Sequence, residues 1–91
     1  MKEKTVNELN LGELGVVNKI IGEETIKRRL LDLGLIEGTN IKPVLISPSG
    51  DPRAFEFRGS LIAIRKEDAE NIKVKWERNK SFGVIANHMK F

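Results

Sequence analysis

Cysteine and tyrosine are absent from this 91-residue sequence, and histidine occurs once, as His88 near the C-terminal end. The lack of thiols excludes disulfides, thiolate zinc sites, iron–sulfur clusters and cysteine nucleophiles. A single histidine cannot form a two-histidine metal motif, and a serine–histidine triad would have to be built on a chain terminus. These absences leave few groups for catalysis, so we expect no enzymatic activity, no cofactor and no specific metal site.

Long apolar runs are also missing. The longest covers only residues 61–64, whereas a membrane-spanning helix needs about 20 apolar residues. The charges at the N-terminus are not followed by the apolar block of a signal peptide. The sequence therefore excludes a transmembrane or secretory protein, and with no cysteine in the chain we expect a small cytoplasmic domain.

Positive charge is scarce in the body of the chain and concentrated at its end. The whole sequence carries 16 basic and 13 acidic residues, a net charge of +3. Residues 73–91 hold five of these basic residues and one of the acids, so residues 1–72 are close to neutral. Nucleic-acid-binding domains usually present a basic stripe on their folded surface. This distribution argues against nucleic acid as a partner, although the basic tail can still reach anionic surfaces.

Short runs of β-branched and aromatic residues, separated by turn residues, predict about five strands. These cover residues 15–21, 40–47, 54–58, 60–65 and 72–75. Closely spaced short strands with a single inserted helix are typical of a mainly β fold, here a small, partly open barrel. Periodicity fades near Trp76, so we expect a barrel domain at residues 1–75 and a basic extension at residues 76–91.

The single helix is predicted over residues 23–33. Ile26, Leu30 and Leu33 recur at the spacing of one helix face, and acidic residues occupy the first turn. Gly34 follows at the position where a left-handed residue commonly ends a helix, and the residues after it can fold back onto the last turn. Both ends of the helix are therefore marked in the sequence.

Turn residues between these elements are expected to be structural. The set comprises Gly34, Gly38, Gly50, Asp51 and Gly59. The glycines supply the positive φ or close approach that turns require. Asp51 lies in a Gly-Asp-Pro turn, where its side chain is expected to bond neighbouring backbone.

A partner-facing patch is expected on the helix and just beyond it. Leu31 lies about 100° around the helix axis from Leu30, near Lys27 and off the main apolar stripe. With Leu35 and Ile36, these two residues form the predicted binding patch. The alternative interpretation is that Leu31 only widens the buried stripe, while Leu35 and Ile36 close the mouth of the barrel.

Four segments occur in an order that resembles the FeoA family. They are residues 29–39 (Arg-Leu-Leu-Asp-Leu-Gly-Leu-Ile-Glu-Gly-Thr), residues 48–52 (Pro-Ser-Gly-Asp-Pro), Gly59 and residues 61–69. The resemblance covers about residues 5 to 74 and depends on the series rather than on one motif. Glu37 stands where the family commonly has proline, which loosens that turn.

The resemblance implies an SH3-like β-barrel without enzymatic activity. It implies a small accessory protein of ferrous iron uptake, which binds the cytoplasmic part of the FeoB-type membrane transporter and meets the inner face of the cell membrane only through this partner. Two other functions stay open: a nucleic-acid-binding barrel that uses Trp76 and the basic tail, and a metal-sensing module that uses His88. An exposed barrel edge can also pair with a second copy of the chain.

Overall fold

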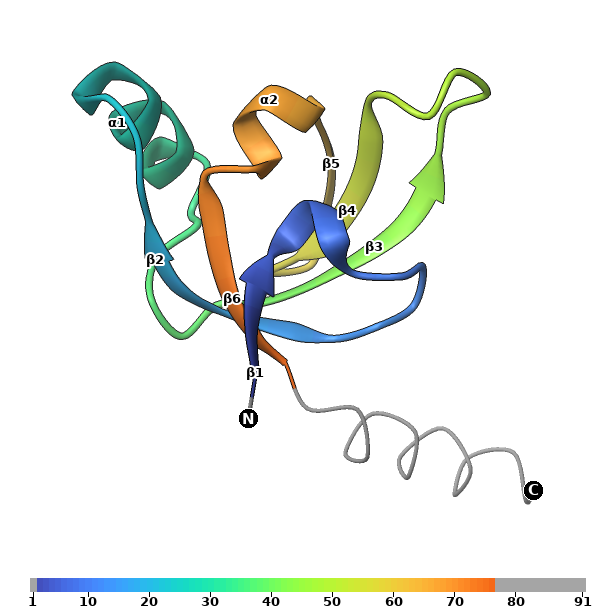
Figure 1. Ribbon diagram of the computed structural model, residues 1–91, viewed down its shortest axis with the longest axis horizontal. Helices are drawn as coiled ribbons and strands as arrows, with labels where there is room; N and C mark the ends of the chain where they lie inside the picture. The colour runs from blue at the N-terminus through green and yellow to red at the C-terminus, as the bar shows by residue number, and fades with distance from the viewer. Residues whose placement is uncertain (1, 77–91) are drawn as a thin grey trace.

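Six antiparallel strands form one continuous sheet in the computed structural model, which describes residues 2–76 (Figure 1). Their order across the sheet is β1-β6-β2-β3-β4-β5, so β1 and β5 are its edges. The strands are β1 (Lys2–Thr5), β2 (Gly15–Ile20), β3 (Asn40–Ile46), β4 (Arg53–Phe57), β5 (Ser60–Ile64) and β6 (Ile72–Trp76). The helices are the 3-10 turn η1 (Val6–Glu8), α1 (Glu24–Asp32) and the short α2 (Lys66–Ala69). The mainly β fold predicted from the sequence is confirmed, with α1 and α2 at one end of the curved sheet.

The edge strand β1 is the element that the sequence did not predict. It consists of Lys-Glu-Lys-Thr, which has one β-branched residue and no apolar alternation. It is a strand because it pairs with β6 over its whole length, from Lys2 opposite Trp76 to Thr5 opposite Lys73. This pairing also places Trp76 inside β6, one residue beyond the predicted end of the barrel. The rest of the predicted extension, residues 77–91, lies outside the described residues.

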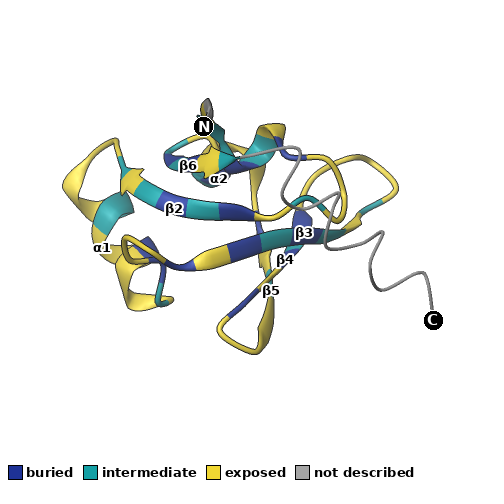
Figure 2. Ribbon diagram, turned by 90° about the horizontal axis from the view of Figure 1, so that it is seen from below, coloured by how far each residue is buried: buried dark blue, intermediate teal, exposed yellow. Residues whose placement is uncertain are grey.

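The core draws at least one side chain from every element except β1. Its buried members are Val6, Leu9, Val17, Leu30, Leu35, Ile41, Phe55, Phe57, Ile64, Ala69, Ile72 and Val74. Buried positions recur along the strands, as Figure 2 shows for β2 and β3. Of the three residues on the predicted apolar face of the helix, Leu30 is buried and Ile26 packs partly against the core. Leu33 is 39% exposed because it stands at the end of α1, where the chain turns.

A buried arginine joins the N-terminal segment to the central hairpin. The Arg53 side chain donates from Nη1 to the carbonyl of Asn7 at 2.8 Å and from Nη2 to the carbonyl of Leu9 at 2.9 Å. Its guanidinium carbon lies 5.9 Å from the centre of the Phe55 ring. Neither η1 nor the loop after it belongs to a strand, so these two bonds fix both of them over the barrel.

Replacing Arg53 by methionine should destabilise the fold, because the carbonyls of Asn7 and Leu9 lose charged donors. We expect Arg53→Met to lower the free energy of unfolding by about 2–4 kcal/mol, measured by urea denaturation. Arg53→Lys is the matched control, since it keeps the charge but cannot reach both carbonyls with two separate NH groups. A change below about 0.5 kcal/mol for the methionine variant would show that the two bonds contribute little.

Glu13 connects the loop before β2 to β1 and β6, which are neighbours at one edge of the sheet. Partial burial raises the pKa of Glu13, but the opposing effects of the Asn10 N–H, the Lys4 ammonium and the Trp76 indole hold it below its usual value. The Asn10 N–H donates to Glu13 Oε1 at 2.6 Å, and Lys4 Nζ lies 3.5 Å from the same oxygen. The ionised form of Glu13 therefore stabilises the folded state.

This depressed pKa predicts a pH-dependent contribution to stability. The contribution is complete above the pKa of an unfolded glutamate, about 4.3, and is lost as the pH falls through the lower folded value. Glu13→Gln should therefore be less stable than the parent at about pH 7, and the difference should shrink towards about pH 3. Denaturation curves over this range measure the effect. A difference that stays constant with pH would contradict it.

The Asp51 side chain bonds a residue that lies far from its own turn in the sequence. Its Oδ1 accepts a hydrogen bond of 2.8 Å from the backbone N–H of Lys66, the first residue of α2. The expectation that Asp51 bonds neighbouring backbone was therefore wrong, because the β3–β4 turn lies against the start of α2. Gly50, next to it, has a φ of +90°, as the turn requires.

No helix within residues 2–76 is both long enough and apolar enough to cross a bilayer.

Candidate partner-binding surface

The C-terminal end of α1 reverses the chain at Gly34. The N–H of Gly34 donates to the Leu31 carbonyl at 2.9 Å, and the N–H of Leu35 donates to the Leu30 carbonyl at 3.2 Å. This pair of bonds, with a φ of +99° at Gly34, is a Schellman motif. It turns Leu35 fully into the core, so Leu35 cannot belong to an exposed patch. Ile36, the next residue, is 48% exposed.

One side of α1 faces α2, and the opposite side does not. Arg29 Nη2 lies 2.7 Å from Asp68 Oδ1, so this side of α1 faces α2. Leu31 lies two residues further on, about 200° around the axis, and points away from α2. It is 49% exposed, and Lys27, one turn earlier, is half-buried. Leu31 is therefore not part of the buried stripe.

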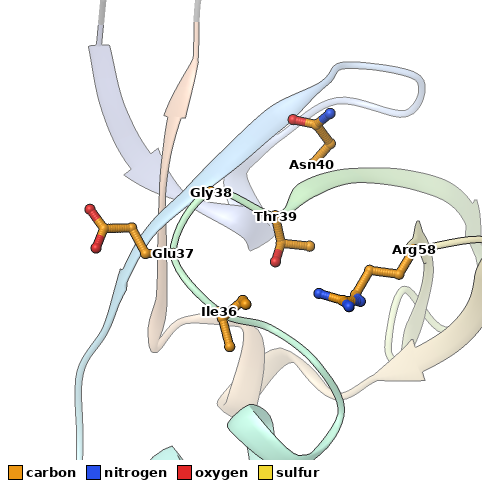
Figure 3. A pocket seen from close by; sticks show the side chains of 6 residues that line it. All are labelled: Ile36, Glu37, Gly38, Thr39, Asn40 and Arg58. Carbon is orange, nitrogen blue, oxygen red and sulfur yellow. The ribbon is translucent and has the colours of Figure 1, made fainter.

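A shallow, open depression of about 330 Å³ lies beside this end of the helix (Figure 3). It is lined by Ile36, Glu37, Gly38, Thr39, Asn40 and Arg58. In Figure 3 the Arg58 side chain extends towards Ile36 and Thr39, whereas Glu37 points away from the space between them. The lining therefore combines an exposed apolar side chain with a guanidinium group.

Arg58 owes its position to the β4–β5 hairpin turn. Arg58 and Gly59 form a two-residue loop with φ values of +52° and +77°, the signs that a type I′ turn requires. Arg58 is the one non-glycine residue with positive φ among residues 2–76. Its Cδ would lie 3.2 Å from a Cβ atom added to Gly34, so the side chain crosses the end of α1. The carbonyl groups at a helix C-terminus carry partial negative charge and favour a cation there.

A methyl group at Gly34 should therefore cost stability for two reasons. Alanine at this φ is strained, and its Cβ would press on Arg58. We expect Gly34→Ala to lower the free energy of unfolding by about 2 kcal/mol, measured by urea denaturation. Gly38→Ala is the matched control, because its φ is +92° but the space around it is open, and it should cost about 1 kcal/mol. Equal losses would show that the Arg58 contact is neutral.

We define the α1-end surface as Lys27, Leu31, Leu33, Ile36 and Arg58. Three of these side chains are exposed and apolar, and two are cationic. An apolar, cationic surface can bind a protein segment by excluding water and by pairing with carboxylates. Within residues 2–76, no group of three or more histidine, cysteine or acidic side chains is arranged to hold a metal ion.

Sequence reasoning selected Lys27, Leu31 and Ile36 but missed Arg58. Nothing in the local sequence shows that a hairpin turn more than twenty residues after the helix returns to the helix end. The available signal was the Arg58-Gly59 pair between two strands, which predicts the turn but not what its side chain touches. Of the other predicted residues, Gly38 and Gly59 have positive φ, as their turns require.

The aromatic residues do not form a stacking platform within residues 2–76. Phe55 and Phe57 are buried in the core. Trp76 is half-buried, and the Lys4 ammonium lies 3.8 Å from the centre of its ring. Phe82 and His88 lie outside the described residues. Of the residues predicted for nucleic-acid binding and for metal sensing, the described part of the chain includes Trp76, while the rest of the basic tail and His88 fall in residues 77–91.

A strongly curved antiparallel sheet of six short strands with one helix of more than two turns defines a small β-barrel domain. The FeoA domain model matches residues 4–75, which is most of the chain. The chain therefore belongs to the FeoA family. The predicted family is confirmed.

Two curated relatives connect this domain to iron transport. The chain is 29% identical over 70 residues to the Fe(2+) transport protein A/Fe(2+) transporter FeoB fusion protein of Porphyromonas gingivalis, strain W83. The match covers 77% of the chain and only 8% of that fusion protein. The chain is also 29% identical over 70 residues to the putative Fe(2+) transport protein A of Campylobacter jejuni, covering 77% of the chain and 95% of that protein.

Solved structures share the fold. The FeoA-like protein from Clostridium acetobutylicum superimposes with a TM-score of 0.77 at 32% identity, over 84% of this chain and 88% of that one. Stenotrophomonas maltophilia FeoA gives a TM-score of 0.69 at 28% identity, over 78% and 88% of the two chains. That protein is described as a prokaryotic SH3 domain protein and was solved with zinc. The barrel of this chain is accordingly SH3-like.

Proposed function

We propose that this protein is a non-enzymatic, cytoplasmic accessory of ferrous iron uptake, which binds the cytoplasmic part of an FeoB-type transporter. The observation that carries the proposal is the Porphyromonas gingivalis relative, in which a domain similar to this chain is fused to FeoB. Fusion keeps two domains at high effective concentration, which is useful when they work on each other. The description of the Stenotrophomonas protein as a candidate activating factor for ferrous iron transport supports the same role.

The α1-end surface is the part of the described chain that we assign to this contact. Leu31 and Ile36 are each about half exposed, so their apolar area is available to a partner. Burying one such side chain contributes about 1–2 kcal/mol, since only the exposed half gains. Lys27 and Arg58 flank them and favour a transporter surface that carries carboxylates. Binding of this kind changes the partner's conformational equilibrium without any chemistry on the barrel itself.

The substitution Leu31→Glu tests the assignment. It places a charge in the middle of the contact and should weaken binding to the purified cytoplasmic domain of the FeoB-type transporter more than about tenfold, measured by calorimetry. Leu11→Glu is the matched control, because Leu11 is 51% exposed against 49% for Leu31. Its loop lies at the opposite end of the molecule from α1 in Figure 1.

The outcomes distinguish an error in the assigned surface from an error in the proposed function. If Leu11→Glu weakens binding and Leu31→Glu does not, the transporter binds elsewhere on the barrel. If the parent protein binds neither the cytoplasmic domain nor the full transporter in vesicles, the accessory function itself is wrong. Thermal unfolding of both variants establishes that neither loss comes from misfolding.

A further inference from the structure

The two edges of the sheet differ in their protection against further pairing. The edge strand β1 is made of Lys-Glu-Lys-Thr, and charged residues are a common device to stop an edge from pairing. The other edge strand, β5, reads Ser-Leu-Ile-Ala-Ile and contains no charge. It follows a two-residue turn whose exposed tip extends from the sheet in Figure 2. An uncharged edge of this length is a ready template for an additional strand.

The hairpin register identifies the main-chain groups that face outward. Phe57 and Ser60 flank the two-residue loop and form the first hydrogen-bonded pair of the ladder. Such pairs alternate with non-bonded pairs, so Leu61 and Ala63 direct their N–H and C=O groups away from β4. Among residues 2–76, no hydrogen bond outside the ladder occupies these groups. Both residues are exposed, Leu61 to 59%.

Cations stand at both ends of this edge. Arg58 precedes β5, and Arg65 and Lys66 follow it, all three exposed. Two nearby carboxylates have other partners: Glu56 lies 3.6 Å from Lys42, and Asp68 pairs with Arg29. Glu67 in α2 and Asp51, which caps α2, are the remaining acids near the second end. The Asp51 carboxylate is already engaged by the Lys66 N–H, so of these acids Glu67 is the one left to oppose Arg65 and Lys66 at the second end. Each end of the edge therefore keeps a cation beyond the acids that are free to pair with it, and the edge favours a segment with acidic residues on both sides of an apolar centre.

The same charges disfavour a second copy of the chain as the occupant. Antiparallel pairing of two β5 edges about Ile62 would place Leu61 opposite Ala63 of the second copy. In that register Arg58 faces Lys66 of the second copy at both ends, and like charges opposite one another destabilise a sheet. The chain's own residues 77–91 are also a poor match, because Arg78, Lys80 and Lys90 outnumber the single acid Glu77.

We propose that the β5 edge binds an extended, acid-flanked apolar segment of a partner protein by adding it to the sheet as a seventh strand. Main-chain bonds to Leu61 and Ala63 hold the segment, and Arg58, Arg65 and Lys66 select its flanks. This surface shares Arg58 with the α1-end surface but contains none of its other four residues. It does not depend on the transporter being the partner.

A synthetic peptide tests the proposal directly. The probe is a run of alternating valine and threonine with two glutamates at each end, and the comparison peptide has lysines in place of the glutamates. The full chain should bind the glutamate peptide at least about tenfold more tightly than the lysine peptide at low salt, because both flanks change the sign of their charge. The backbone amides of Leu61 and Ala63 should become protected from hydrogen exchange when the peptide binds.

Ala63→Pro removes the outward N–H without removing a bond to β4, since proline is tolerated on an edge strand where its nitrogen faces solvent. It should weaken peptide binding at least about tenfold, whereas the matched Ala63→Val variant keeps the donor and should bind like the parent. Leu31→Glu should also leave peptide binding unchanged, which separates this test from that of the transporter contact. Unfolding curves show whether the proline variant is folded.

Three results would overturn the proposal. The first is equal binding of the two peptides, which would remove the role of the flanking cations. The second is peptide binding that is the same for folded Ala63→Pro and Ala63→Val, which would place the peptide elsewhere. The third is a dimer of the free protein that Ala63→Pro dissociates, measured by sedimentation, which would make a second copy the occupant of the edge.

Discussion

The chain reversal at Gly34 is the constraint on which the exposed surface depends. It ends α1, turns Leu35 into the core and leaves Ile36 on the outside. A left-handed residue is needed there, and the absence of a Cβ also leaves room for the stem of Arg58. This one backbone position thus fixes the burial of Leu35, the exposure of Ile36 and the path of the Arg58 side chain.

Local signals in the sequence were sufficient for most elements and for the turns between them. The helix was predicted from spacing and caps, and the β4–β5 hairpin from alternating phenylalanines followed by Gly59. The strand β1 could not be predicted, because its residues carry no periodic apolar signal and only β6 makes them a strand. The exposure of Leu31 and Ile36 follows from helix geometry, whereas the burial of Leu35 depends on the details of the cap. Arg58 and the long-range bond of Asp51 depend on tertiary contacts that no local pattern contains.

The two surfaces that we propose for partners differ chemically, although both lie on one small domain. The α1-end surface presents side chains, so its selectivity depends on shape and charge. The β5 edge presents main-chain groups, so it accepts many sequences and uses the cations beside it to choose among them. Arg58 belongs to the turn between β4 and β5 and also lines the depression beside α1. A partner bound to either surface would therefore contact Arg58, and a shift of this side chain would alter the other surface.

The position of Trp76 lets the intrinsic fluorescence of the protein report on one contact of the fold. The sequence contains one tryptophan and no tyrosine, so ultraviolet emission excited above the phenylalanine band comes from a single indole. This indole ends β6 opposite Lys2, beneath the Lys4 ammonium, with its Nε1 buried. Detachment of β1 would expose the ring to water and shift its emission to longer wavelength. The fluorescence spectrum thus reports on the contact between β1 and β6, where two segments far apart in the sequence meet.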